Sequence, residues 1–198
     1  MDAAILAGGR ARRFGGRDKG SLRVGGVSIL DRQLAALGGV ADRVLLVTRD
    51  PARHREERVH TVADLVPGAA ALGGIYTALA SAAADHVLVL ACDLPFLTAS
   101  FLGRLASLTG PGHDAIVPRS RDGLQPLCAV YARRLVAPLR RQIDAGHLKV
   151  VDFLATVRVH EIGPDALAES DPGGTLFFNV NGPSELERAN ELATRHGL

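Results

Sequence analysis

Up to residue 117, short apolar runs alternate with longer amphipathic segments. Five runs have the composition of strands buried in a parallel sheet, namely 3–6, 43–47, 61–63, 86–91 and 115–117. Between them, apolar residues at helical spacing predict helices over 28–38, 74–84 and 98–108, with Ser28 and Thr98 as N-caps. This order predicts βαβ units with right-handed crossovers.

The rest of the chain departs from strict alternation. Segments 125–131 and 156–162 have the pattern of strands, and 133–145 and 184–195 that of helices. The first of these strands follows 115–117 across a polar turn, which predicts an antiparallel hairpin. We therefore expect an α/β three-layer sandwich, with a Rossmann-like, mostly parallel sheet and an antiparallel addition in the C-terminal half. Without a long linker, residues 1–198 are expected to form one domain.

A loop of glycines and cations follows the first predicted strand directly. The pairs Gly8-Gly9 and Gly15-Gly16 permit left-handed backbone and close approach of N–H groups to a ligand. Arg13 and Lys19 offer charge-assisted hydrogen bonds to phosphoryl oxygens. The loop therefore predicts a polyphosphate site at the carboxyl edge of the sheet, the alternative being an ordinary surface loop.

Two better-known glycine motifs do not fit this loop. A Walker loop needs Ser or Thr directly after its lysine, but Gly20 follows Lys19. The dinucleotide fingerprint G-x-G-x-x-G does not follow Leu6 either. The loop therefore matches neither of these motifs.

Asp93 follows the apolar run 86–91, so its carboxylate is expected at the same sheet edge as the glycine loop. There it would bind Mg²⁺, which proteins hold through one or two carboxylates together with phosphate oxygens and water. The alternative is that Asp93 only ends the strand before Pro95. The nearby glycine loop favours the metal site.

A third polar group lies near the C-terminal end of the chain. Asn179 and Asn181 bracket one apolar residue, so in extended backbone their amides would point to the same side and orient phosphate or metal-bound water. Alternatively they bond the backbone of a turn. Ser184 is predicted to cap the helix that follows.

Composition and charge narrow the classes of function. The net charge is +2 and the basic residues are scattered, so nucleic acid is not an expected partner. No run reaches the roughly 18 apolar residues of a membrane span. Because the start also lacks the basic region of a secretory signal, we expect a soluble cytoplasmic protein, whose Cys92 and Cys128 stay unpaired.

Three motifs then point to one family. They are L-A-G-G-x₃-R-F-G-G-x-D-K from Leu6, C-D-L-P-F-L from Cys92 and F-N-V-N-x-P from Phe178. In this order they resemble the signatures of the molybdenum cofactor guanylyltransferases, the bacterial MobA family. The resemblance covers essentially the whole chain and includes segments 72–74 and 122–127. The glycine loop alone indicates only the wider nucleotidyltransferase superfamily.

The resemblance implies transfer of GMP from GTP to molybdopterin, with pyrophosphate as the second product. Mg²⁺ on Asp93 and the cations Arg13 and Lys19 would align and neutralise the two polyanions. The N-terminal part would bind the nucleotide and the C-terminal part mainly the acceptor. Transient contacts with cofactor biosynthesis proteins or target-enzyme chaperones are also implied.

The same resemblance assigns the nucleoside contacts. It implies backbone contacts from Leu6, Ala7 and Gly8, and a guanosine contact from Asp64. Gly9 favours GTP, because related cytidylyltransferases have Leu-Ala-Ala-Gly here. The chain departs from the family pattern at two positions. Thr48, a further candidate contact, stands where the family often has asparagine, and Gly182 replaces a usual threonine.

Two other classes of function stay open. One is a related nucleotidyltransferase that uses CTP with molybdopterin, or a sugar phosphate. The other is a non-catalytic nucleotide-binding regulator. Asp93 and Lys19 favour an enzyme over a regulator, because binding alone does not require a metal-binding carboxylate beside a phosphate-binding cation.

Overall fold

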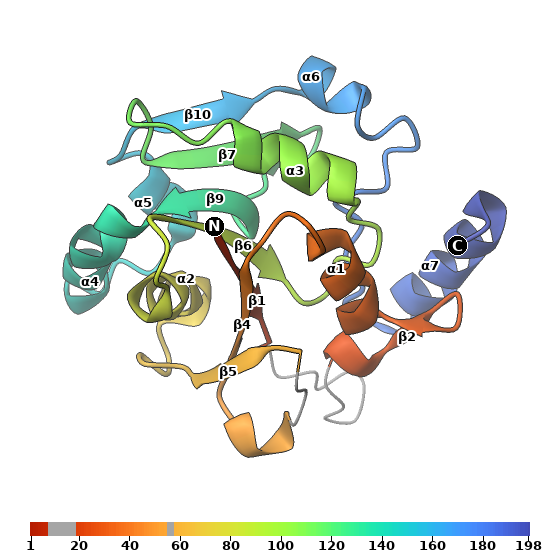
Figure 1. The fold of residues 1–198 in the computed structure, drawn as a ribbon, viewed down its shortest axis with the longest axis horizontal. Helices are drawn as coiled ribbons and strands as arrows, with labels where there is room; N and C mark the ends of the chain where they lie inside the picture. Colours follow the sequence, from red (N-terminus) through yellow and green to blue (C-terminus); the bar gives the residue numbers. More distant parts are fainter. Residues whose placement is uncertain (8–18, 55–57) are drawn as a thin grey trace.

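The computed structural model describes residues 1–7, 19–54 and 58–198 (Figure 1). Within them the centre of the fold is an eight-stranded mixed sheet, in the order β10-β7-β9-β6-β1-β4-β5, with β8 paired to β7. The strands are β1 (Asp2–Leu6), β4 (Arg43–Thr48), β5 (His60–Ala63), β6 (His86–Ala91), β7 (Ala115–Ser120), β8 (Gly123–Leu124), β9 (Cys128–Ala132) and β10 (Val159–Ile162).

The N-terminal half of the sheet is parallel. β1 lies between β4 and β6, and β4 pairs with β5. Leu6, the end of β1, is in register with Val47 of β4 and Ala91 of β6, so these strands finish together at one edge. The residues that follow each strand are thereby brought to a common place, as βαβ topology requires.

The predicted antiparallel addition is confirmed. β9 runs antiparallel to both β6 and β7, while β10 is parallel to β7. The polar turn after β7 forms the small strand β8, which pairs antiparallel with the end of β7. Along the strand order β10-β7-β9-β6-β1-β4-β5 of the described sheet, β9 is therefore the strand that runs opposite to the others.

Helices cover both faces of the sheet, as the predicted three-layer sandwich requires. Figure 1 shows α1 (Ile29–Leu37) and α3 (Ala99–Ser107) on one side, and α2 (Ala70–Ser81) and α4 (Val136–Asp144) on the other. A hydrophobic core lies on each face of the sheet, and alternate residues of β1 pack in the two cores. Ala4 lies on the α2 side, whereas Ala3 and Ile5 lie on the α1 side. The short helices α5 (Val150–Leu154) and α6 (Pro164–Ala168) add to these layers.

Helix starts agree with the sequence where a cap is present. Ser28 Oγ accepts from the Asp31 N–H at 3.0 Å, and Thr98 Oγ1 accepts from the Phe101 N–H at 3.2 Å, as predicted. Ser184 is not a cap: helix α7 (Pro183–His196) begins one residue earlier, with Gly182 as N-cap. Proline at the first helical position explains this start, because its fixed φ suits the first turn and it has no N–H to satisfy.

Other boundaries shift as well. α2 begins at Ala70, four residues before its predicted start, and the predicted strands 125–131 and 156–162 shorten to β9 and β10. The predicted helix over 133–145 is a 3₁₀ turn, η4 (Arg133–Leu135), followed by α4.

A third cluster of buried residues joins the C-terminal segment to the chain after the glycine loop. The hairpin of β2 (Arg23–Val24) and β3 (Val27–Ser28) follows the 3₁₀ turn η2 (Lys19–Ser21) and lies beside α7 in Figure 1. Val24 packs in this cluster with Val180 and Ala189. The cluster therefore fixes where residues near 180 lie relative to Lys19.

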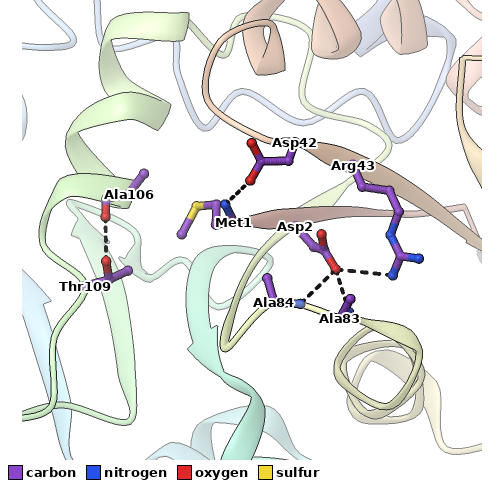
Figure 2. A network of polar contacts seen from close by, with 8 residues as sticks. All are labelled: Met1, Asp2, Asp42, Arg43, Ala83, Ala84, Ala106 and Thr109. Carbon is purple, nitrogen blue, oxygen red and sulfur yellow. Dashed lines mark hydrogen bonds and ion pairs between the residues drawn. The ribbon is translucent and has the colours of Figure 1, made fainter.

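The amino end of the sheet is held by a separate polar network (Figure 2). The buried Asp2 carboxylate accepts through Oδ2 from the N–H groups of Ala83 and Ala84, at 2.8 and 3.3 Å, and from Arg43 Nη2 at 3.2 Å. The Met1 amino group lies 2.6 Å from Asp42 Oδ2. This network lies at the amino ends of β1 and β4, and the candidate site lies at the carboxyl ends of the same strands. No helix within the described part of the chain is long and apolar enough to span a membrane.

Candidate active site

A cavity of about 440 Å³ lies at the carboxyl ends of β1, β4, β5 and β6. Five of the residues predicted for the site line it, namely Leu6, Lys19, Thr48, Asp64 and Asp93. A volume of this size falls in the range of small-molecule and cofactor sites. The sheet edge that the sequence predicts is thus the edge that carries the cavity.

Lys19 is the centre of a polar group in this cavity. Its Nζ donates to Asp93 Oδ2 at 2.9 Å and to Asn181 Oδ1 at 2.7 Å. The side chains of Lys19 and Asp93 are only 15% and 16% exposed, so their attraction is screened less than that of a surface pair. Asn181 stays in place through its neighbour, because the Val180 N–H donates to the Asp93 carbonyl at 3.0 Å.

The second oxygen of Asp93 is the unusual feature of this group. Oδ1 is buried and has no hydrogen-bond partner among the described residues. A buried carboxylate oxygen without a donor is unfavourable, and such groups are often completed by a ligand or ion. Asp93 therefore has an unused acceptor directly beside an ammonium group.

Thr48 and Asp64 form the side of the cavity beyond β1. The Asp64 N–H donates to the Thr48 carbonyl at 2.8 Å, which extends the pairing of β4 with β5 by one residue. Thr48 is buried, and its Oγ1 accepts from the Asp50 N–H at 3.3 Å. Asp64 Oδ1 accepts from the Val66 N–H at 3.0 Å, while Oδ2 has no partner among the described residues.

The first turn of α2 completes this wall. Ala70 and Ala71 line the cavity, and Ala70 has a φ of 50°, a left-handed conformation that is strained for a residue with a Cβ. Further along the helix, Gly74 packs so closely on β1 that a Cβ there would lie 3.0 Å from Leu6 Cδ1. Glycine thus lets α2 approach the end of β1.

The two asparagines take different positions. The segment around them is not a strand, so the predicted strand end at these residues is wrong. Asn179 Nδ2 donates to the Phe177 carbonyl at 3.1 Å, the local bond that was the alternative reading for that residue. Asn181 instead reaches Lys19. A role for Asn179 at the site stays a prediction.

Most of the glycine loop lies outside the residues that the structure describes. Gly8, Gly9 and Arg13 lie outside the described residues. Ala7, the residue before them, is described: its N–H donates to the Val47 carbonyl at 2.8 Å and continues the pairing of β1 with β4. The chain therefore enters the loop at the cavity.

Thr77 is a contact that sequence reasoning missed. Its side chain lies about two turns into α2 and is fully buried, yet its hydroxyl reaches Asp64 Oδ1 at 3.3 Å. The signal available was a hydroxyl residue within an otherwise apolar helical segment. Cys92 lines the cavity and is buried, while burial raises the pKa of the Cys128 thiol; neither observation makes a thiolate nucleophile.

A lysine paired with a carboxylate at the carboxyl edge of a Rossmann-like sheet fits an α/β nucleotidyltransferase. The comparisons with known proteins agree. The chain belongs to the MobA-like NTP transferase domain family, whose model matches residues 3–159. It is accordingly a nucleotidyltransferase enzyme.

Curated relatives are similar over their full length. The chain is 36% identical to the probable molybdenum cofactor guanylyltransferase of Pelotomaculum thermopropionicum, over 96% of this chain and 91% of the relative. It is 32% identical to the molybdenum cofactor guanylyltransferase of Desulfosudis oleivorans, over 100% and 98% respectively. Both relatives are named for the same activity.

Solved structures share the fold. Molybdopterin-guanine dinucleotide biosynthesis protein A from Archaeoglobus fulgidus superposes with a TM-score of 0.84 at 29% identity, covering 98% of this chain and 100% of that one. A 2-C-methyl-D-erythritol 4-phosphate cytidylyltransferase from Thermus thermophilus superposes with a TM-score of 0.70 at 19% identity, covering 98% and 100%. The second likeness concerns the fold alone.

Proposed function

We propose that this protein transfers GMP from GTP to molybdopterin, forming the guanine dinucleotide cofactor and releasing pyrophosphate. The observation that carries the proposal is the contact of Lys19 with Asp93 and Asn181 at the cavity, where a cation for phosphate meets a carboxylate with an unused oxygen. The names of the full-length relatives support guanine and molybdopterin as the two substrates.

Asp93 is the residue that would hold Mg²⁺. Its buried Oδ1, which has no partner within the described part of the chain, fits such a role, because Mg²⁺ prefers carboxylate and phosphate oxygens. The amide oxygen of Asn181 is nearby, since it accepts from the same lysine that donates to Asp93. When bound, the ion supplies positive charge that neutralises the triphosphate and its leaving group. Asp93 itself supplies the fixed negative charge at the end of β6.

Lys19, which lies beside Asp93, would donate to the triphosphate and to the departing pyrophosphate. Arg13 is assigned the same kind of role, although it lies outside the described residues. The terminal phosphate of molybdopterin attacks the α-phosphorus of GTP, and the bond from that phosphorus to pyrophosphate breaks. The attacking group is already an anion, so alignment and charge neutralisation suffice without a covalent enzyme intermediate.

The nucleoside would lie against the wall formed by β4, β5 and α2. Asp64 Oδ2 accepts from the N1–H of guanine in this proposal, while Leu6, Ala7 and the pair Gly8-Gly9 contact the nucleotide through the backbone, and Thr48 adds a hydroxyl. The N-terminal part of the single domain then binds GTP, and the C-terminal part, with Asn179 and Asn181, mainly binds the acceptor.

The proposed setting is the cytoplasm, with transient contacts to proteins that supply molybdopterin or insert the product into target enzymes. The lability of the cofactor supports direct transfer rather than release into solution. Capture of such proteins on the immobilised chain, in the presence and absence of molybdopterin, tests this part.

The decisive experiment offers GTP, CTP and ATP in turn with Mg²⁺ and molybdopterin, and measures pyrophosphate and dinucleotide. GTP should give the fastest turnover, with no product when Mg²⁺ is chelated. Faster turnover with CTP would overturn the base assignment. Product formed with a sugar phosphate in place of molybdopterin would replace the acceptor assignment.

A further inference from the structure

The Thr77 hydroxyl lies between helix α2 and the residues that follow β5. Its one hydrogen is shared by two acceptors, the Gly73 carbonyl at 2.8 Å and Asp64 Oδ1 at 3.3 Å. Its oxygen accepts from the Leu65 N–H at 3.0 Å. The hydroxyl thus contacts both the side chain of Asp64 and the backbone of the residue after it.

This contact sets which oxygen of Asp64 is available. Oδ1 takes hydrogen bonds from Thr77 and from the Val66 N–H, and a carboxylate oxygen has room for about two donors. Oδ2, which has no partner among the described residues, is left for a ligand in the cavity that Asp64 lines. Thr77 is itself fully buried and is not one of the lining residues, so it acts through Asp64.

We infer that Thr77 is a positioning residue for the nucleobase contact of Asp64, and that it thereby sets the preference for a 6-oxopurine over a 6-aminopurine. The inference rests on the proposed function, in which Asp64 contacts the base. A 6-oxopurine presents an N1–H to Oδ2, whereas the bare N1 of adenine presents a lone pair to the same negative oxygen. A carboxylate held in one orientation attracts the first base and repels the second.

The orientation of the Asp64 carboxylate depends both on the Thr77 hydroxyl and on the close packing of α2 against the loop 64–69. A Cβ at Gly73 would lie 2.9 Å from Ala69 Cβ and 3.0 Å from the Val66 carbonyl, so α2 and the loop 64–69 are in direct contact. Without the Thr77 hydroxyl, Oδ1 keeps one donor and the Leu65 N–H loses its acceptor. The Asp64 carboxylate is then held by one hydrogen bond in place of two, and its less fixed orientation weakens attraction and repulsion alike.

The test compares the full chain with Thr77→Val, which keeps the shape and removes the hydroxyl, and with Thr77→Ser, which keeps the hydroxyl. Dissociation constants for GTP and for ATP are measured directly, without molybdopterin. In Thr77→Val the ratio of GTP affinity to ATP affinity should fall about fivefold, as loss of one hydrogen bond to a charged group predicts. Thr77→Ser should retain the parent ratio.

Two further variants separate positioning from packing. Leu79→Val loosens the buried face of the same helix away from Asp64, and should lower stability without changing the ratio. Should Thr77→Val fail to fold, Thr77→Ala also removes the hydroxyl and is expected to show the same fall. An unchanged ratio, or equal weakening of both nucleotides, in folded Thr77→Val or Thr77→Ala overturns the inference.

The outcome is independent of the transfer reaction. A parent protein that binds GTP in preference to ATP, but forms no dinucleotide with molybdopterin, removes the proposed function and leaves the inference standing. A parent protein that binds the two nucleotides equally overturns the inference.

Discussion

Asp2 and Asp93, at opposite ends of the parallel strands, differ in how their carboxylate oxygens are used. Asp2 accepts three hydrogen bonds at the amino edge and joins β1 to β4 and to the segment after α2. Asp93, at the carboxyl edge, has one oxygen on Lys19 and the other without a donor among the described residues. The three hydrogen bonds to Asp2 indicate a structural role, and the unused oxygen of Asp93 indicates a ligand.

Asp93→Asn should leave the fold intact and lower turnover by about 10²-fold or more, because an amide neither carries the charge that holds Mg²⁺ nor balances Lys19. Steady-state turnover and circular dichroism check this. Asp2→Asn is the matched control and should lower the melting temperature while turnover per folded molecule is kept. Undiminished turnover in folded Asp93→Asn would remove Asp93 from the mechanism.

The chain offers a natural control for Lys19, since Lys149 is its other lysine and lies exposed at the start of α5. Lys19→Ala should raise KM for GTP by about tenfold or more, from loss of a charge-assisted hydrogen bond to phosphate. Lys149→Ala should leave KM unchanged. Equal KM values in the two variants would contradict a phosphate role for Lys19.

Among the described elements, helix α2 contacts the site through several residues along its first two turns. It enters the cavity wall at Ala70 in a left-handed conformation, packs Gly74 on Leu6, and holds Asp64 through Thr77. Strain at a non-glycine residue persists only where surrounding contacts hold it. The same helix thus carries strain, close packing and a buried polar contact within two turns.

Ala70→Gly should raise stability by about 0.5–1 kcal/mol, because glycine adopts positive φ without the Cβ clash. For a chain of this length that corresponds to a rise of about 1–4 °C in the melting temperature, measurable by calorimetry. Ala71→Gly, one residue into the same helix, should instead lower stability by about 0.5–1 kcal/mol. A fall in both variants would show that the φ of Ala70 is unstrained.

The elements that sequence patterns predicted are those with a local physical signal. A local signal of this kind exists for the caps at Ser28 and Thr98, for the buried run before Asp93 and for the hairpin after β7. The structure confirms all of them. The start of α2 has no such signal: Ala69 offers no side-chain acceptor, and the glycines favour a later start. The Thr77 contact depends on tertiary packing, which spacing along the chain does not encode.

For the molecule as a whole, Asp114 joins three strands at the edge of the sheet away from the site. It precedes β7, its Oδ2 accepts from Arg158 before β10, and its carbonyl accepts from the Ala132 N–H at the end of β9. Arg134 Nε donates to its other carboxylate oxygen at 2.8 Å. Hydrogen bonds from Arg158, and then from Arg134, hold the pKa of Asp114 well below its ordinary value, although burial opposes them.

A lowered native pKa makes stability depend on pH in a defined direction. The contribution of Asp114 is complete above its unfolded pKa of about 4, and is lost as pH falls from there toward the lower native value. Asp114→Asn should therefore have a lower melting temperature than the parent at pH 7, and the difference should shrink below about pH 4. Asp122→Asn, an exposed carboxylate on the hairpin, should show no such convergence.

The contact of Lys19 with Asp93 and Asn181 has a consequence for the order in which the enzyme matures. The three contacting residues come from the start, the middle and the C-terminal part of the chain. Asn181 is synthesised after β10, which ends at Ile162. A ribosome therefore completes every described strand of the sheet before it delivers the residue that anchors Lys19. A nascent chain arrested between these points should protect its sheet from proteolysis yet leave Lys19 without its amide partner.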